Sequence, residues 1–446
     1  MVLAGLGEGA RAHVYSIPLV QRWRGMSVRE GVILLGPAGA GEFSPFARYD
    51  PRQSRPWLDA ALEAATTQPP PAKRTNIQVN ASVPAVGPEV AAGIVRQSGG
   101  CRTVKVKVAE PGDTLSAERD RLAAVRDALG AAGAIRIDAN GEWDAATAVE
   151  RIAQLDRAAG GLEYAEQPCR TVAELAEVRR RSAVPIAADE SIRLSADPLA
   201  VVRQDAADIA VLKVQPLGGV RACLELAERL GLPVVVSSAL ETSIGLAAGL
   251  ALAAALPDLP FACGLATAQL LATDATSHPL RPVDGQIRLA LPPPDRLQEV
   301  AADAATTSAW QARLAQVVTL DAGGSAWSDA TRRAEGAPRA ATGPADPAGR
   351  RCSARGEVPD AALGAGPEDV DRATATADPA GRAAADAATT SAWQARLAQV
   401  VTLDAGGSAW SDAARRAEGA PCAATGPADP ASRVAAGGTT EPGGVG

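Results

Sequence analysis

Two lysines separated by one valine lie in the apolar stretch TVKVKVAE, residues 103–110. Only four of the 44 lysine and arginine residues in this chain are lysine, at positions 73, 105, 107 and 213. Arginine keeps its proton in proteins, whereas a lysine can lose it when burial and nearby positive charge lower its pKa. Residues i and i+2 of a strand share a face, so Lys105 and Lys107 point the same way. The spacing therefore predicts a strand that carries an acid/base amine beside a second ammonium.

Three carboxylates end successive strand-like segments further along the chain. Asp138, Glu166 and Asp189 follow one another at 28 and 23 residues, and Lys213 ends the next segment, 24 residues later. Each step is about the length of one βα unit, so all four side chains are expected at the same rim of a parallel sheet. Converging carboxylates repel one another unless a cation lies between them, and oxygen-only ligands favour a hard ion. We predict that the three carboxylates bind Mg²⁺, with Mn²⁺ as the alternative, between the lysine pair and Lys213.

Each of these features has a simpler explanation when it is taken alone. A lone KVK segment commonly marks an edge strand that discourages aggregation, and a lone aspartate at a strand end commonly caps a helix or forms a turn. Independent causes of this kind do not place charged residues on five consecutive strands at the same end. The pattern therefore favours an active site.

The segments that carry these residues alternate between strand-like and helical patterns. From about residue 78 the strand-like segments are IQVNASVPAV, TVKVKVAE, AIRIDANG, LEYAEQP, VPIAADES, DIAVLKVQP, LPVVVSSAL and FACGLAT. Eight strands alternating with helices favour a closed α/β barrel. An open doubly wound sheet is the alternative, but no strand is followed by a GxGxxG turn. Residues 1–77 have an α+β pattern, in which VYSIPL and VREGVILLGP are strands, GAGEF is a glycine turn and WLDAALEAA is a helix.

The C-terminal part contains a near-identical internal copy. Residues 301–350 recur at 384–433, and the two copies differ only at Thr331/Ala414, Arg339/Cys422 and Gly349/Ser432. In each copy only TTSAWQARLAQVV has a helical pattern. Thr307 or Ser308 is its expected N-cap, and its shared face comprises Trp310, Leu314, Val317 and Val318. The rest of residues 321–446 is rich in Ala, Gly, Pro and Asp, a composition typical of disorder.

The bulk composition argues against several classes of protein. A net charge of −7 and a pI of about 5.2 disfavour a nucleic-acid-binding protein, which needs a basic surface. The N-terminus lacks the basic and apolar regions of a secretory signal, and the longest apolar run, residues 244–256, is too short to span a bilayer. The six cysteines form no CxxC pair, which is typical of free thiols in a reducing compartment. We expect a cytoplasmic protein without membrane insertion; a monomer is compatible with the sequence, and the oligomeric state is left open.

The motifs KVK, RIDANG, AEQP, AADES and VLK, in this order and spacing, resemble the muconate-lactonizing-enzyme-like subgroup of the enolase superfamily. Within that subgroup, GMSVREGV, GAGEFSPFARYD, VNASVPAV, VVVSSALETSIGL and ACGLAT resemble the o-succinylbenzoate synthase family. The resemblance covers roughly residues 1–320 and implies an N-terminal α+β capping domain and a modified (β/α)7β barrel. The expected division is a capping domain at 1–77, a barrel at 78–285, a return to the capping domain at 286–320, and a low-complexity tail at 321–446.

The resemblance also implies roles for individual residues. Lys107 is the acid/base, Lys213 stabilises the anionic intermediate from the opposite face, and Ser237 and Gly264 contact the succinyl end of a small carboxylate substrate. The implied reaction is the dehydration of 2-succinyl-6-hydroxy-2,4-cyclohexadiene-1-carboxylate to o-succinylbenzoate in menaquinone biosynthesis, through a Mg²⁺-stabilised enediolate. The two histidines of the chain, His13 and His278, do not end strands, so a histidine base is not expected.

Rival functions stay open at this point. An N-acylamino acid racemase or a dipeptide epimerase on the same scaffold would use one lysine on each face of its substrate. The eighth strand, CGLAT, lacks the DxD-type motif expected of a dipeptide epimerase, and no acidic residue follows Gly264 within it, as muconate lactonisation would require. The racemase is harder to separate, because some members of the family catalyse both reactions. A non-catalytic scaffold protein would have no reason to keep charges at five strand ends.

Overall fold

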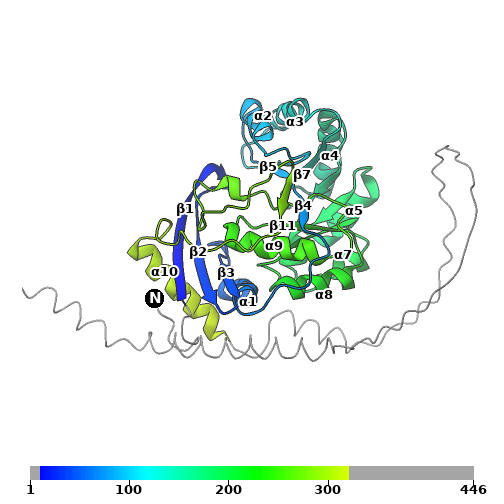
Figure 1. Cartoon of the computed structure of the whole chain (residues 1–446). Helices are drawn as coiled ribbons and strands as arrows, with labels where there is room; N and C mark the ends of the chain where they lie inside the picture. Colours follow the sequence, from blue (N-terminus) through cyan, green and yellow to red (C-terminus); the bar gives the residue numbers. More distant parts are fainter. Residues whose placement is uncertain (1–10, 321–446) are drawn as a thin grey trace, which may run out of the picture. The chain divides into compact units, whose positions relative to one another are not determined.

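The computed structural model describes residues 11–320, which form an antiparallel sheet with its helices and a parallel barrel (Figure 1). The N-terminal sheet has the order β1-β2-β3 and is antiparallel throughout. Its strands are β1 (Arg11–Trp23), β2 (Met26–Gly36) and β3 (Gly39–Phe43). The predicted strands VYSIPL and VREGVILLGP are confirmed within β1 and β2.

The prediction of a glycine turn at GAGEF was wrong, because these five residues are strand β3. The helix α1 (Pro51–Thr66) packs against this strand, and a Cβ on Gly41 would lie only 1.9 Å from the carbonyl oxygen of Ala61. The glycine therefore permits a close approach of helix and strand rather than a turn. Asp50 begins α1 in a capping box with Gln53, and the predicted helix WLDAALEAA lies within it.

Seven parallel strands form the barrel sheet, in the order β11-β10-β9-β8-β7-β6-β5. They are β5 (Ala81–Val83), β6 (Thr103–Lys107), β7 (Ala134–Asp138), β8 (Tyr164–Glu166), β9 (Ile186–Ala188), β10 (Ile209–Lys213) and β11 (Val234–Ser237). The predicted eighth strand, FACGLAT, is reduced to two parallel bridges, Val79 with Cys263 and Ser237 with Gly264. These bridges join the two edges of the sheet, so the barrel closes.

An α-helix follows each of the seven strands before the next barrel strand begins, as in a (β/α)7β barrel. The covering helices are α2 (Pro88–Arg96), α3 (Leu115–Leu129), α4 (Ala145–Ala159), α5 (Val172–Arg181), α6 (Glu190–Arg193), α7 (Ala200–Arg203), α8 (Val220–Leu230) and α9 (Ser243–Ala255). Nearly every residue of α9 is buried, so the apolar run at residues 244–256 belongs to the core. Across residues 11–320, no helix has the length and apolar character needed to cross a membrane.

The segment IQVNASVPAV was predicted as one strand but contains two. Its first part is β4 (Asn76–Gln78), which pairs antiparallel with β12 (Gln286–Arg288) outside the barrel sheet. Its second part is β5. A short 3-10 helix, η1 (Ala268–Leu270), lies between the last barrel bridge and β12.

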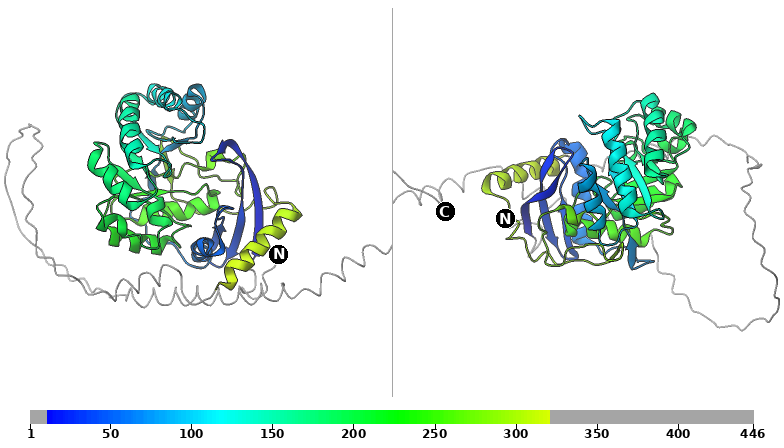
Figure 2. Two further views of the ribbon diagram at one scale, coloured as in Figure 1. Left: turned by 180° about the vertical axis from the view of Figure 1, so that it is seen from behind. Right: turned by 90° about the horizontal axis from the view of Figure 1, so that it is seen from above.

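The last described helix, α10 (Ala304–Thr319), lies against the strands of the N-terminal sheet in Figure 1 and in both views of Figure 2. The predicted apolar face is confirmed, since it is buried in one cluster with Val32, Phe43 and Trp57. The predicted N-cap was one turn too late, because Asp303 begins the helix and accepts a hydrogen bond from the Thr306 amide. The predictions for residues 321–446, including the second copy at 384–433, lie outside the described residues.

Candidate active site

A cavity of about 910 Å³ opens at the carboxyl ends of the barrel strands. Barrel residues line one side, among them Lys105, Lys107 and Lys213. The N-terminal sheet and its loops line the other side, through residues 23–26 and 46–48. The cavity therefore lies between the barrel and the N-terminal domain, where a substrate would be shielded from water.

Strand geometry brings the two lysines of KVK to this cavity. Val104, Val106 and Val108 pack into the core between barrel and helices, which places the alternate residues Lys105 and Lys107 on the inner face. In the register of neighbouring strands, Lys107 pairs with Asp138, and Asp138 pairs with Glu166. The predicted side chains thus lie at one level, at the ends of adjacent strands.

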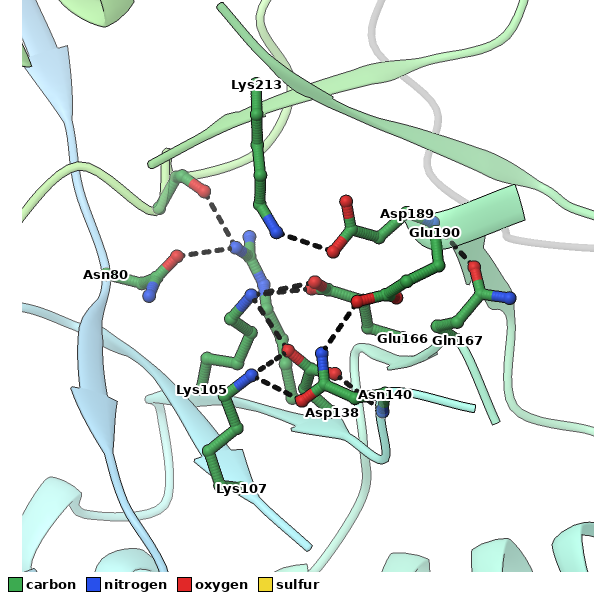
Figure 3. A network of polar contacts seen from close by, with 12 residues as sticks. Asn80, Lys105, Lys107, Asp138, Asn140, Glu166, Gln167, Asp189, Glu190 and Lys213 are labelled. Carbon is green, nitrogen blue, oxygen red and sulfur yellow. Dashed lines mark hydrogen bonds and ion pairs between the residues drawn. The ribbon is translucent and has the colours of Figure 1, made fainter. Parts of the chain in front are cut away.

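Each of the three predicted carboxylates faces a lysine (Figure 3). Lys105 Nζ donates to both carboxylate oxygens of Glu166, at 2.8 and 2.9 Å. Lys107 Nζ lies 2.5 Å from Asp138 Oδ2. Lys213 Nζ lies 2.5 Å from Asp189 Oδ2, on the other side of the carboxylates. A group placed over the carboxylates would therefore have amines on opposite sides.

The two lysines of KVK differ in their affinity for a proton. Burial opposes the charge of Lys105, but the charges of Glu166 and Asp138 outweigh it and raise its pKa. Burial lowers the pKa of Lys107 by more than Asp138 raises it, and the ammonium of Lys105 lowers it further. Lys105 therefore holds its proton more tightly than Lys107, and Lys107 is the amine better suited to give up a proton.

The carboxylates influence one another through their charges. Burial and the charge of Asp138 together raise the pKa of Glu166 to about 7. For Asp138, burial is outweighed by Lys107 and Lys105, which hold its pKa far below the usual range. For Asp189, burial is outweighed by Arg193 and Lys213, which lower its pKa to about 2. The negative charges of Asp138 and Glu166 repel each other, so a nearby cation is needed when both groups are ionised.

These carboxylates have the chemistry of a site for a hard cation. Within residues 11–320, no three acidic, histidine or cysteine side chains are assembled around one point, and the ammonium groups of lysine neutralise Asp138, Glu166 and Asp189 instead. All three carboxylates are fully or almost fully buried, and the donor set is oxygen only. The residues present therefore fit Mg²⁺.

Ser237 and Gly264 lie beside each other in the wall of the cavity, where the last strand bridge closes the barrel. A Cβ on residue 264 would lie 2.6 Å from Ser237 Oγ. The glycine therefore leaves room for the serine hydroxyl next to Lys213, its register partner on β10. The hydroxyl of the next residue, Ser238, lies 2.8 Å from that of Thr267, and both also line the cavity.

Sequence reasoning missed polar residues that orient the predicted ones. Asn140 Oδ1 accepts from Lys107 Nζ at 2.8 Å, and its amide donates to Glu190 at 3.0 Å. Gln167 Oε1 accepts from the backbone amides of Asp189 and Ser191, which holds the turn after β9. Asn140 lies two residues after Asp138 in the motif RIDANG, and Gln167 lies one residue after Glu166 in the motif AEQP. This closeness to a strand-end acid is the sequence signal that could have identified them.

Two arginines at the site were also missed. Arg136, two residues before Asp138 on the same face of β7, is fully buried and donates to Asn80 and to the carbonyl of Ala262. The i+2 rule that placed the lysines could have found it. Arg193 donates to Asp189 at 2.9 Å and to the Tyr49 hydroxyl at 2.6 Å. Since Tyr49 belongs to another domain, no local pattern predicts that contact.

The N-terminal domain covers the cavity with aromatic and basic side chains. The ring centroid of Trp23 lies 5.6 Å from Lys107 Nζ. Arg24, in the turn between β1 and β2, pairs with Glu110 of the barrel at 3.2 Å and is a further cause that lowers the pKa of Lys107. The N-terminal domain therefore contributes to the pKa of Lys107, and the pattern of charges at the strand ends does not reveal this contribution.

Comparison with known proteins gives a consistent family assignment. Residues 14–65 match the family model described as Enolase N-terminal domain-like, and residues 89–296 match the one described as Enolase C-terminal domain-like. An o-succinylbenzoate synthase of Thermobifida fusca (strain YX) is 60% identical over 303 residues, which are 68% of this chain and 94% of that protein. An o-succinylbenzoate synthase of Mycobacterium tuberculosis (strain ATCC 25618 / H37Rv) is 49% identical over 312 residues, which are 70% of this chain and 94% of that protein.

Solved structures share the fold at low sequence identity. The muconate lactonizing enzyme from Pseudomonas putida matches with a TM-score of 0.55 and 19% identity, over 66% of this chain and 99% of that one. The L-Ala-D/L-Glu epimerase from Bacillus subtilis matches with a TM-score of 0.54 and 21% identity, over 64% of this chain and 96% of that one. These likenesses confirm the expected capping domain and barrel, and they carry no information about the substrate.

Proposed function

Because the chain belongs to the o-succinylbenzoate synthase family of the enolase superfamily, we propose that it dehydrates 2-succinyl-6-hydroxy-2,4-cyclohexadiene-1-carboxylate to o-succinylbenzoate. The protein is an enzyme that acts on a small-molecule substrate. The observation that carries the reaction class is the placement of Lys107 and Lys213 on opposite sides of the buried carboxylates, within the same cavity. The reaction is the one that menaquinone biosynthesis requires.

In the proposed mechanism, neutral Lys107 removes the proton from the ring carbon that bears the carboxylate. Burial and the charge of Lys105 supply the low proton affinity that this step needs. Asn140 and Asp138, both hydrogen-bonded to Lys107 Nζ, fix the direction in which the amine points. The electron pair of the broken C–H bond delocalises onto the substrate carboxylate.

The second step returns the same proton. Lys107, now an ammonium, donates it to the departing hydroxyl group on the same face, so that water leaves and the ring becomes aromatic. Lys213 on the opposite side is the fixed cation that stabilises the negative charge between the two steps. One amine therefore acts first as base and then as acid, and the second does not need to exchange a proton.

Enzymes of this superfamily generally use Mg²⁺. We assign Asp138, Glu166 and Asp189 as the residues that would hold it, because they are buried at the ends of three neighbouring strands and limited to oxygen donors. When bound, the ion would stabilise the charge that develops on the substrate carboxylate. Ser237 and Gly264 are assigned to the succinyl end of the substrate, since they line the cavity beside Lys213.

The experiment that tests this function offers the purified protein two kinds of substrate, the cyclohexadiene carboxylate and N-succinylamino acids. We expect kcat/KM to be at least about 100-fold higher for dehydration, a difference of about 2.7 kcal/mol in transition-state binding. The N-acylamino acid racemase is the rival on the same scaffold, and it is not favoured by the names of these relatives. Racemisation that outpaced dehydration would reverse the assignment.

The division of the chain into domains and its cellular location are also proposals. We retain the division into a capping domain at 1–77, a barrel at 78–285, a return segment at 286–320 and a tail at 321–446. The return segment is supported by α10, which packs on the N-terminal sheet. A cytoplasmic location is supported by the four described cysteines, all of which are free and buried.

A further inference from the structure

Part of the cavity wall on the capping-domain side is the loop of residues 44–50, which joins β3 to α1. Phe46, Ala47 and Arg48 of this loop line the cavity. A turn bond from the Tyr49 amide to the Phe46 carbonyl, at 3.0 Å, is its internal backbone hydrogen bond. A loop with so few bonds of its own depends on neighbouring elements for its shape.

One side chain of the C-terminal helix supplies much of that support. Arg313 of α10 donates to the carbonyls of Pro45, Phe46 and Tyr49 at 2.9, 2.7 and 3.1 Å, and to the Ser54 hydroxyl at 3.2 Å. The guanidinium is planar and has five donors spread over three nitrogens, so a single arginine can bind carbonyls that lie too far apart for the one nitrogen of a lysine. Three of the four acceptors belong to the loop.

The helix that carries Arg313 is itself firmly placed. Trp310 packs edge-on against Phe43 with ring centroids 6.0 Å apart, and its indole donates to Glu30 at 3.1 Å. The guanidinium of Arg313 lies 5.0 Å from the centre of the same indole ring. Arg313 therefore holds the loop from a rigid base and does not itself line the cavity.

The loop in turn reaches the carboxylates of the barrel. The hydroxyl of Tyr49 accepts from Arg193 at 2.6 Å, and Arg193 donates to Asp189 at 2.9 Å. The ring of Phe46 packs edge-on against Trp57 and Tyr49, with centroids 5.6 and 5.8 Å apart. A continuous series of contacts thus runs from Arg313 through Tyr49 and Arg193 to Asp189.

We propose that Arg313 is a positioning residue for the active site: it sets the shape of loop 44–50, which forms the capping wall of the cavity and orients Arg193 against Asp189. The proposal rests on the proposed function for its kinetic readout. It assigns to the C-terminal helix a part in substrate binding, in addition to its part in covering the N-terminal sheet.

Any test must ensure that the second copy of the helix sequence does not take the place of α10. Arg396 stands in the copy where Arg313 stands in α10, and the 20 residues 384–403 are identical to 301–320. The variants are therefore made in the full-length Arg396→Ala protein. That background should itself match the wild type in kcat and KM.

A matched control distinguishes positioning from simple stability. Arg55 of α1 also binds α10, since its guanidinium donates to the Leu320 carbonyl at 2.9 Å. Within residues 11–320, the side-chain hydrogen bonds of Arg55 go to Asp59 and Leu320 and not to loop 44–50. Arg55→Ala should therefore lower the melting temperature and leave KM for the cyclohexadiene carboxylate unchanged.

Arg313→Ala is expected to raise KM by about 10-fold, the usual effect of losing hydrogen bonds to a charged group, with a smaller change in kcat. Arg313→Lys should recover only part of the loss, because the single nitrogen of an ammonium cannot replace donors that lie on two nitrogens of the guanidinium. Hydrogen–deuterium exchange should rise in residues 44–50 of Arg313→Ala and not in Arg55→Ala. An unchanged KM and unchanged exchange in the loop would overturn the proposal, as would equal effects of the two variants. If the parent protein showed no dehydration at all, the proposed function would fail, and the exchange experiment would still decide the role of Arg313.

Discussion

Lys107 and Lys213 face the same cavity from opposite sides, yet their surroundings suit different tasks. Lys107 has a lowered pKa because of burial and the neighbouring Lys105, while Lys213 is paired with Asp189 at 2.5 Å. An amine that must lose and regain a proton cannot be replaced by arginine, whereas a fixed cation can be replaced in part. This contrast separates a dehydratase with one base from a racemase with two.

We therefore expect Lys107→Arg to keep the fold and to lose about 10²- to 10⁴-fold in kcat, the usual contribution of a positioned acid/base. Lys107→Ala should behave alike, and exchange of the substrate proton with D₂O should vanish in both variants. Lys213→Arg should be clearly milder. Equal damage from Lys213→Arg would favour two-base racemisation, and near-normal dehydration by Lys107→Arg would place the base elsewhere.

The three carboxylates Asp138, Glu166 and Asp189 lead to a prediction about metal binding. EDTA should abolish turnover, and Mg²⁺ or Mn²⁺ should restore it. By calorimetry, Asp138→Asn should weaken Mg²⁺ binding by at least about 10-fold, because a carboxylate ligand is lost at a site that depends on charge. Asp120→Asn, an exposed position on α3, is the matched control and should bind normally. Full activity in metal-free buffer would remove the three carboxylates from their assigned role.

At the scale of elements, the interface between β3 and the start of α9 is built on buried charge. Glu42 of β3 accepts from the backbone amide and the hydroxyl of Thr242, which begins α9. Arg29 of β2 donates to the carbonyls of Ala239 and Leu240, in a loop that lines the cavity. Glu241 lies in the same loop and is 3% exposed. The capping domain therefore holds a barrel loop through ionic groups, which makes the interface sensitive to pH.

Burial, followed by the charge of Glu42, raises the pKa of Glu241 to about 7, and Arg29 opposes the shift. The folded protein therefore binds a proton at this residue more tightly than the unfolded chain does, whose glutamates titrate near 4.3. The free energy of unfolding should fall as pH rises from about 4.3 to about 7 and stay at the lower value above that, a contribution of at most about 4 kcal/mol. In Glu241→Gln this fall should be missing, as measured by thermal unfolding at about pH 5 and about pH 8. A wild type and variant with parallel pH profiles would contradict the assignment.

Glycine positions offer a second prediction at the same scale. At Gly41 a Cβ would collide with the carbonyl of Ala61, so Gly41→Ala should lower stability by more than about 2 kcal/mol by separating β3 from α1. Gly93, inside α2, has nothing within 4 Å of the position of a Cβ. Gly93→Ala should raise stability by about 0.5–1 kcal/mol through helix propensity. Urea unfolding of both variants measures the two effects, and the same sign in both would refute the packing argument.

At the scale of the whole molecule, the N-terminal sheet is covered by α10, the last helix of the described residues. Arg55 binds the carbonyl of Leu320, and the apolar face of α10 is buried in the core of the capping domain. A chain that ends after residue 320 should therefore keep its melting temperature and kcat/KM. A chain that ends after residue 300 should lose both, because it exposes Phe43 and releases loop 44–50. If the longer truncation product were inactive or insoluble, residues 321–446 would have a structural part.

Local pattern was sufficient for the barrel and for its strand-end charges. A βα unit repeats about every 25 residues and side chains alternate along a strand, so spacing alone placed Asp138, Glu166, Asp189 and the lysines at one rim. The order of helices and strands followed from the same periodicities. The errors were local too: GAGEF was taken as a turn because glycine is common in turns, whereas here it permits close packing of α1.

What the sequence determined by itself is the chemistry of the barrel rim, because that chemistry depends on positions within single strands and on their order. What only the tertiary structure decided is the other half of the site: which side chains of the capping domain close the cavity, and how Arg193, Tyr49 and Arg313 connect it to the C-terminal helix. Tyr49 and Arg313 are 264 residues apart, and their contact depends on how separate elements pack. Periodicity describes one element at a time, whereas packing depends on the shapes of all of them together. The pKa values of Lys107 and Glu241 belong to this second class, since burial and the charges of other elements set them.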